Sequence, residues 1–243
     1  MNHSNITIEP QSIAQRAYAV NSEKSVSKEY TRKNLDVSSE WTIVFDCETT
    51  NDETQNLRVG AYQVYRHSTL WQQGLILNRE SLSEDDLNVI NSYACEHDLS
   101  VKDKSDFIEE ILFGIGYDLR AEIVGFNLPF DIARLAIRQN SARGITFRGG
   151  FTFQLSSNRY RSYIQIKHLN SRASLIQFTA PPRQRDSRGM RRRKIKTSAM
   201  RGFFIDVKTL AAAITAQSHS LESLTNLLQT KNRKHSIETH GEA

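Results

Sequence analysis

The pattern of apolar and polar positions predicts alternating strands and helices after residue 38. The first element is a β-branched and aromatic run centred on 43–45, typical of a buried strand. Two segments that can alternate between apolar and polar residues follow at 57–67 and 69–78. Their short link predicts an antiparallel hairpin. The first three strands are therefore expected to form a meander.

Helical spacing and capping residues predict the helices 84–98, 103–120, 130–140, 207–216 and 221–230. Short apolar runs predict strands at 122–126 and 202–206. The segment 144–178, rich in Phe, Ile, Tyr and Thr, predicts two or three antiparallel strands. This order indicates an α/β fold, with a mixed β-sheet of five or more strands, helices packed on it and an antiparallel strand insertion.

Composition indicates a soluble cytoplasmic protein with one sizeable core. The 243 residues are 38% apolar and 24% charged, and no run approaches the roughly 18 apolar residues of a membrane span. The N-terminus lacks the features of a secretory signal, and two cysteines are too few for a disulfide framework. Residues 1–38 are expected to be a loosely ordered arm, and 39–243 one domain.

Charge is unevenly placed along the chain, whose formal net charge is +5. The segment 181–201 contains nine Arg or Lys residues and one acid, so it carries +8 and the remainder −3. On this count the basicity belongs to one loop. Arg191, Arg192 and Arg193 in this loop could be part of a solvated linker, whereas in a nuclease-like fold they are expected to contact phosphates.

Candidate chemistry begins at the end of the first strand, where Asp46 and Glu48 lie two residues apart. Residues at this spacing share one face of a strand, so Cys47 between them should be a packed thiol on the other face. Adjacent carboxylates repel unless a proton or cation lies between them, and Mg²⁺ or Mn²⁺ suits such oxygen ligands. The alternative is a strand end with two solvated acids.

A second acidic position, Asp131, lies in the first turn of the helix after the strand 122–126. The helix dipole favours an acid there, and Asn127 is expected to cap this helix. Asp206 ends the strand 202–206, where a capping or substrate-positioning role is expected.

The segments I-V-F-D-C-E-T-T and G-F-N-L-P-F-D resemble the first two motifs of the DEDD-type 3′–5′ exonucleases. The second has the N-x₃-D form of family B DNA polymerase proofreading domains and related phage and plasmid proteins. G-F-F-I-D-V-K-T-L and S-L-E-S-L-T-N-L-L are similar to the strand and helix that precede the third motif. The resemblance covers roughly 41–240.

The resemblance implies a ribonuclease H-like fold and two-metal hydrolysis of phosphodiesters at single-stranded 3′ ends, in DNA more than in RNA. Asp46 would contact both ions, Glu48 would hold the ion that activates water, and Asp131 would support the second ion.

For the substrate, the resemblance implies that Asn127 lies near the terminal nucleotide and that Thr49 and Thr50 line the sugar and base pocket. Asp206 corresponds to an acid that is not a metal ligand in the family. A polymerase or another replication protein is the implied class of partner.

The third motif, Tyr or His followed by Asp four or five residues later, has no counterpart after Leu228. The chain resembles a family member that ends before this motif, so weak or absent nuclease activity is expected. The alternatives are a nucleic-acid-binding module without catalysis and a regulatory partner completed by another chain.

Overall fold

The computed structural model describes residues 39–179 and 202–231, which belong to one compact unit that begins at Ser39. The expectations for 1–38 and for the loop 181–201, with Arg191, Arg192 and Arg193, lie outside the described residues.

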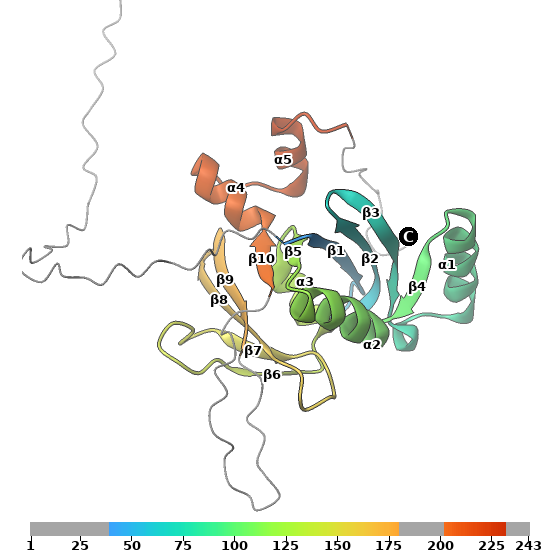
Figure 1. Ribbon diagram of the computed structural model, residues 1–243, viewed down its shortest axis with the longest axis horizontal. Helices are drawn as coiled ribbons and strands as arrows, with labels where there is room; N and C mark the ends of the chain where they lie inside the picture. Colours follow the sequence, from blue (N-terminus) through green and yellow to red (C-terminus); the bar gives the residue numbers. More distant parts are fainter. Residues whose placement is uncertain (1–38, 180–201, 232–243) are drawn as a thin grey trace, which may run out of the picture. The chain divides into compact units, whose positions relative to one another are not determined.

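The larger of two sheets has six strands in the order β10-β5-β1-β2-β3-β4 (Figure 1). Their bounds are β1 Trp41–Thr49, β2 Leu57–Arg66, β3 Thr69–Leu77, β4 Ser100–Asp103, β5 Glu122–Gly125 and β10 Phe203–Asp206. β1 pairs antiparallel with β2 and parallel with β5, which in turn pairs parallel with β10. The mixed α/β architecture is therefore confirmed.

The predicted hairpin is also confirmed, with β2 and β3 joined through His67 and Ser68. Both turn residues have positive φ, 48° and 68°, as the common two-residue hairpin turn requires. β4, which pairs parallel with β3 at the edge of the sheet, was not predicted. Its four residues, SVKD, are too few to show an apolar alternation.

The helices are α1 Glu84–Glu96, α2 Lys104–Asp106, α3 Leu128–Leu135, α4 Val207–Thr215 and α5 Leu221–Leu227, with a short 3₁₀ turn, η2, at Arg79–Ser81. α2 continues into a π-helix, η3 Phe107–Asp118, as the predicted helix 103–120. Ser83 and Ser220 cap α1 and α5, each through a capping box. None of the helices among the described residues is long and apolar enough to cross a membrane.

One helix prediction is wrong at its end. The helix predicted over 130–140 stops at Leu135, because Ala136 turns to an extended conformation (φ −70°, ψ 141°). The next residues form strand β6, Arg138–Ser141, which pairs with β7, Phe151–Gln154. Pairing with a neighbouring strand thus overrides the helical pattern of this polar segment.

β6 opens a second sheet of four antiparallel strands, completed by β8 Ile164–Asn170 and β9 Ala173–Phe178 in the order β6-β7-β8-β9. This sheet is the predicted insertion, with one strand more than expected. Its inner face supplies Phe153, Ile164, Ile166 and Phe178 to the same core as the first sheet.

η3 lies against β1 and forms the centre of that core. Phe107 packs at ring-centroid distances of 5.6 Å from Phe45 and 5.3 Å from Tyr62. A side chain at Gly116 would meet Ile123 Cδ1 at 3.0 Å, so glycine lets η3 approach the sheet closely. Burial of these aromatic groups is the main stabilising contribution in this part of the fold.

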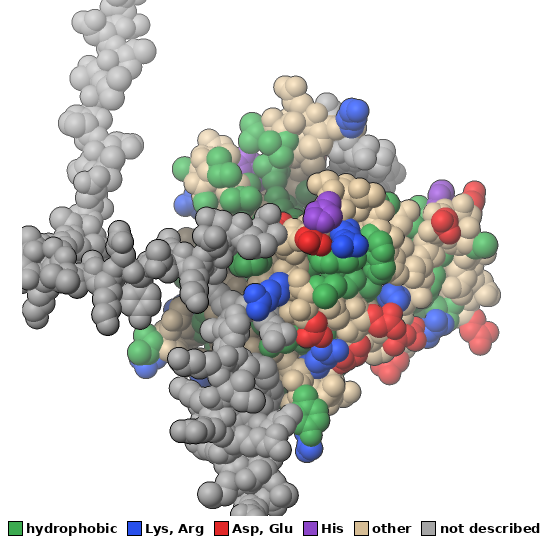
Figure 2. All heavy atoms as spheres, viewed as in Figure 1, with side chains coloured by type: hydrophobic (Ala, Val, Ile, Leu, Met, Phe, Trp, Pro, Cys, Tyr) green, Lys and Arg blue, Asp and Glu red, His purple; other side chains and the backbone are tan. Residues whose placement is uncertain are grey.

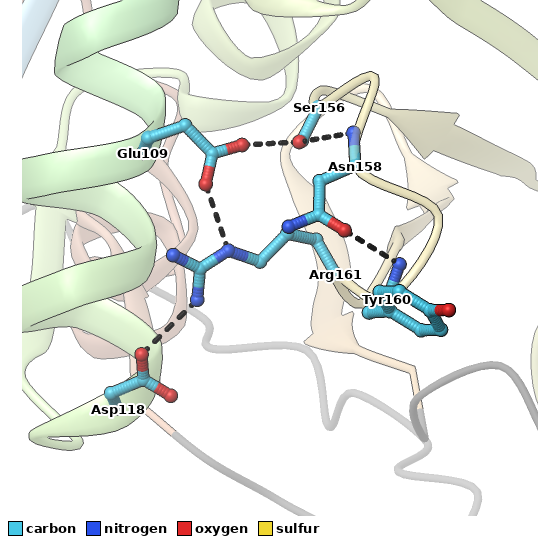
Figure 3. Close-up of polar contacts among 6 residues, drawn as sticks. All are labelled: Glu109, Asp118, Ser156, Asn158, Tyr160 and Arg161. Carbon is cyan, nitrogen blue, oxygen red and sulfur yellow. Dashed lines mark hydrogen bonds and ion pairs between the residues drawn. The ribbon is translucent and has the colours of Figure 1, made fainter. Parts of the chain in front are cut away.

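A polar network joins η3 to the loop after β7 (Figure 3). Arg161 donates to Glu109 at 2.8 Å and to Asp118 at 3.1 Å, and Ser156 donates to the second oxygen of Glu109. The Arg161 guanidinium also lies 5.0 Å from the centre of the Phe113 ring. Because both acids come from η3, these contacts hold the second sheet to the first.

Candidate functional site

Strand β1 presents its two acids as predicted. Its burial alternates, with Ile43, Phe45 and Cys47 buried and with Asp46 and Glu48 exposed on the opposite face. The thiol of Cys47 is packed in the core, and burial, followed by the nearby carboxylates, raises its pKa well above the usual value. Cys47 is therefore a packed core thiol, whereas Asp46 and Glu48 are accessible from solvent.

Asp131 lies on α3, which packs against β1. Its side chain is only 2% exposed. The Cys47 backbone N–H donates to Oδ1 at 3.3 Å, whereas Oδ2 has no hydrogen-bond partner among the described residues. Burial, and then the Asp46 carboxylate, raises the pKa of Asp131 to about 8. An unpartnered buried carboxylate oxygen beside another carboxylate requires a proton or a cation.

Two features bring α3 this close to β1. A side chain at Gly125 would meet Leu128 Cδ2 at 2.6 Å and the Phe45 carbonyl at 3.0 Å, so only glycine allows this approach. Asn127 then turns the chain in the left-handed region (φ 71°, ψ 42°), which Asn adopts more readily than most residues. Pro129 follows within the first turn of α3, where its missing N–H costs little.

The predicted capping of α3 by Asn127 is wrong, because its side chain makes no capping hydrogen bond. Asp206 takes this role from the end of β10. Its Oδ1 accepts from the backbone N–H groups of Asn127 and Leu128 at 2.9 and 3.1 Å. Its Oδ2 caps α4 by accepting from the backbone N–H and hydroxyl of Thr209. The capping interpretation of Asp206 is thus confirmed, and both of its oxygens are occupied.

Thr49 is half-buried at the end of β1, and Thr50 begins the loop 50–56. The Thr50 hydroxyl donates to Asp52 at 2.8 Å and accepts from the Asn56 backbone N–H at 3.0 Å. Hydrogen bonds from Thr54 and Thr50 are the largest causes that lower the pKa of Asp52. Contact of Thr49 and Thr50 with a nucleotide stays a prediction, and Thr50 already has two partners within its own loop.

Arg134, which the sequence did not single out, attaches this loop to α3. Its guanidinium donates to the Gln55 carbonyl at 3.1 Å and to the Gln55 side chain at 2.9 Å. The elements that carry Asp46 and Asp131 are therefore linked a second time, outside the core. An Arg on the same helix as a candidate ligand was the only sequence signal for this contact.

An open groove with a volume of about 430 Å³ runs along the sheet face that carries Asp46. Its lining comes from β1, β2, β3, α1, α5 and the residue after β5, and includes Val44, Asp46, Ala61, Gln63, Gln73, Tyr93, Phe126 and Leu221. Most of this surface is apolar or aromatic, with one carboxylate. Such a groove has the composition of a binding site for a small ligand or an unstacked base.

The oxygen-only donor set of Asp46 and Asp131 fits a hard divalent cation such as Mg²⁺ or Mn²⁺. Within 39–179 and 202–231, however, no three His, Cys, Asp or Glu side chains converge closely enough to form a metal site. The structure thus associates Asp46 with Asp131, but it does not bring Glu48 into a three-carboxylate cluster with them.

Sequence reasoning also missed the basic character of the second sheet. Residues 138–179 contain seven Arg or Lys residues and no Asp or Glu, so the basicity does not belong to 181–201 alone. The signal was the absence of acids over 42 consecutive positions. It becomes informative once these residues are known to form one sheet.

Comparison of the chain with protein-family models, with curated proteins and with solved structures gave no match in any of the three.

Proposed function

We propose that this protein is a metal-dependent 3′–5′ exonuclease of ribonuclease H-like fold that hydrolyses phosphodiesters in single-stranded nucleic acid, DNA more than RNA. The observation that carries the proposal is the buried oxygen Oδ2 of Asp131, which has no hydrogen-bond partner in the described part of the chain and is close to the charge of Asp46. Burying a carboxylate oxygen without a partner costs free energy, and a bound cation would offset that cost.

The topology supports the same reading. β1, β5 and β10 are neighbouring parallel strands, so their carboxyl ends meet at one edge of the sheet. Asp46 and Asp206 lie at two of these ends, and Asp131 lies in the helix that follows the third. Open α/β sheets place their active sites at this edge. The motif resemblance and the strand order therefore indicate one location.

In this proposal a bound divalent cation would supply charge neutralisation for the phosphate and an activated water. The residues of the chain have separate roles. Asp46 and Asp131 would hold the cation, and Glu48, exposed on the same face of β1 as Asp46, would join them only if its side chain moved toward the bound ion. Cation binding would displace the proton that the raised pKa of Asp131 indicates. Asp206 would position α3, and Tyr93 and Phe126 in the groove could stack on a base.

The decisive experiment is degradation of a single-stranded oligonucleotide labelled at its 5′ end, in Mn²⁺, by wild type and by Asp46→Asn. Because the third motif has no counterpart, we expect only slow stepwise shortening from the 3′ end by wild type. Asp46→Asn should lower this rate by about 10²-fold or more, because a metal ligand is removed. Asp85→Asn, an exposed acid on α1, is the matched control and should retain full activity. Equal degradation by Asp46→Asn and wild type would refute the proposed site.

A nucleic-acid-binding module without catalysis is the second candidate. It is favoured by the absence of a converging group of three metal-ligating side chains among the described residues. This protein would bind the same oligonucleotide in a gel-shift assay, yet wild type would leave it intact in both Mg²⁺ and Mn²⁺.

Metal binding itself can be measured without a substrate. Isothermal titration with Mn²⁺ at neutral pH should give a binding signal in wild type that both Asp46→Asn and Asp131→Asn abolish. Proton release should accompany binding, so the apparent heat should change with the ionisation enthalpy of the buffer. Identical titrations for the three proteins would exclude a cation site at these carboxylates.

A further inference from the structure

The second sheet differs in charge from the part of the chain that precedes it in the same unit. Residues 138–179 carry +7, whereas residues 39–137 carry −11, with seven Arg or Lys and 18 Asp or Glu residues. Acidic side chains are visible instead beside α1, β4 and α2 of the first sheet (Figure 2). Separation of charge between two sheets of one compact unit creates a positive surface that attracts a polyanion.

Most of these positive charges have no ion-pair partner among residues 39–179 and 202–231. Of the seven cations, only Arg161 forms ion pairs within the described part of the chain, with the Glu109 and Asp118 carboxylates shown in Figure 3. Arg138, Arg143 and Arg148 are exposed. Like-charged groups without partner acids lower stability unless a ligand of opposite charge binds them, so their accumulation points to binding.

The strand register places polar groups on the outer face of this sheet, opposite the buried Phe153 and Ile164. The outer residues are Arg138, Asn140, Thr152, Gln154, Gln165, Lys167, Leu175 and Gln177. Gln165 donates to Thr152 at 3.4 Å and accepts from Gln177 at 3.2 Å. The face therefore offers amides and hydroxyls between cations.

The loop 142–150 folds onto this outer face and brings two further cations to it. Gln165 donates to the Arg143 carbonyl at 3.3 Å, and Lys167 donates to the Thr146 carbonyl at 3.1 Å. Arg143 and Arg148 therefore lie on a loop that is fixed next to Lys167. We call Arg138, Arg143, Arg148 and Lys167 the basic surface.

Both edge strands of the second sheet, β6 and β9, are connected to elements of the candidate site. β6 begins three residues after α3, the helix that carries Asp131. On the other side, the Ser174 backbone N–H of β9 donates to the Thr209 hydroxyl at 3.2 Å, and the same hydroxyl donates to Asp206. A ligand bound along this sheet would therefore lie next to the elements that hold the carboxylates.

We propose that the basic surface binds the phosphate backbone of a nucleic-acid strand and holds it beside the carboxylate site. The proposal rests on the proposed function for the choice of nucleic acid, and its charge evidence is independent of catalysis. An anionic membrane is the poorer match, because the exposed apolar side chains on the outer face and its loop are Ile145, 89% exposed, and Leu175, 37% exposed. Two such side chains bury too little apolar area to anchor a protein in a bilayer.

The test is the salt dependence of affinity for a fluorescent oligothymidine, measured without divalent ions for the full chain and for Arg138→Gln/Arg143→Gln/Arg148→Gln. Each phosphate contact contributes about 0.7 to the slope of log affinity against log salt for single strands. We expect the triple variant to lose about two units of slope and about tenfold or more in affinity at low salt. Arg148→Glu, a single change on the exposed loop, should lower affinity in the same direction and guards against misfolding of the triple variant.

The matched control, Arg66→Gln/Arg79→Gln/Lys104→Gln, removes the same charge from β2, η2 and α2, away from the second sheet. Arg66 and Arg79 already pair with Glu40 and Asp103. The slope of this control should equal that of wild type. Equal slopes for wild type, the Arg138/Arg143/Arg148 triple variant and the control variant would overturn the proposal. So would a triple variant that loses binding to phosphatidylserine vesicles but not to the oligonucleotide. A reduced slope together with no hydrolysis in Mn²⁺ would leave the basic surface standing and refute only the exonuclease proposal.

Discussion

Replacing Asp206 by Ala is expected to destabilise the protein by roughly 3–5 kcal/mol, the largest effect of any single polar residue in the described fold. Its carboxylate accepts four hydrogen bonds, two from the turn before α3 and two from Thr209 at the start of α4. The side chain is 8% exposed, so water cannot replace these bonds fully. Without it, the N–H groups of Asn127 and Leu128 are left unpaired in a buried setting.

Urea unfolding at neutral pH measures this loss, with Ser83→Ala as the control. Ser83 caps only α1, at an exposed position, and its removal should cost about 1 kcal/mol. If Asp206→Ala proves no worse than Ser83→Ala, the turn at Asn127 is held by other contacts. Since this turn also orients α3, Asp206→Ala should weaken Mn²⁺ binding at Asp131 as well.

The second large effect is on the pH dependence of stability. The pKa of Asp131 is raised to about 8 in the folded protein, against about 4 for an exposed Asp. Between these values the folded state holds a proton that the unfolded state has lost, so stability falls as pH rises from about 4 to about 8. Asp131→Asn cannot lose this proton, and its stability relative to wild type should increase over that window by a few kcal/mol, at up to about 1.4 kcal/mol per pH unit.

The measurement is the difference in free energy of unfolding between Asp131→Asn and wild type, from pH 4 to pH 9, with a chelator present. Taking the difference removes the contribution of the other titrating groups. Asp46→Asn should be measured alongside, because removing its negative charge lowers the pKa of Asp131. The free energy of unfolding of this variant should therefore fall less steeply with pH than that of wild type. A difference that does not change with pH would show that Asp131 is ionised normally in the fold.

Adding Mn²⁺ to the wild type should reduce this slope, because a bound cation stabilises the charged form of Asp131. The proton and the cation compete for one oxygen, Oδ2, which the described protein residues leave without a partner. The pH experiment therefore reports on the same atom as the calorimetric titration, by an independent readout.

Several elements of this protein are determined by local sequence alone. The alternation on β1 places Asp46 and Glu48 on one face and Cys47 on the other, since side chains in a strand alternate by sterics. The hairpin of β2 and β3 and the capping of α1 by Ser83 also follow from neighbouring residues. Each depends on contacts within a few positions of the chain, which a sequence pattern records directly.

The tertiary structure decided what depends on distant segments. The polar segment Arg138–Ser141 is a strand because β7 supplies partners for its backbone groups, which no local pattern encodes. The cap of α3 comes from Asp206, 79 residues after Asn127, because β10 ends beside β5. The pKa of Asp131 depends in the same way on burial and on Asp46, both set by the packing of α3 against β1. Burial and electrostatic proximity are properties of the packed chain, and so the sequence could name the candidate carboxylates but not their state.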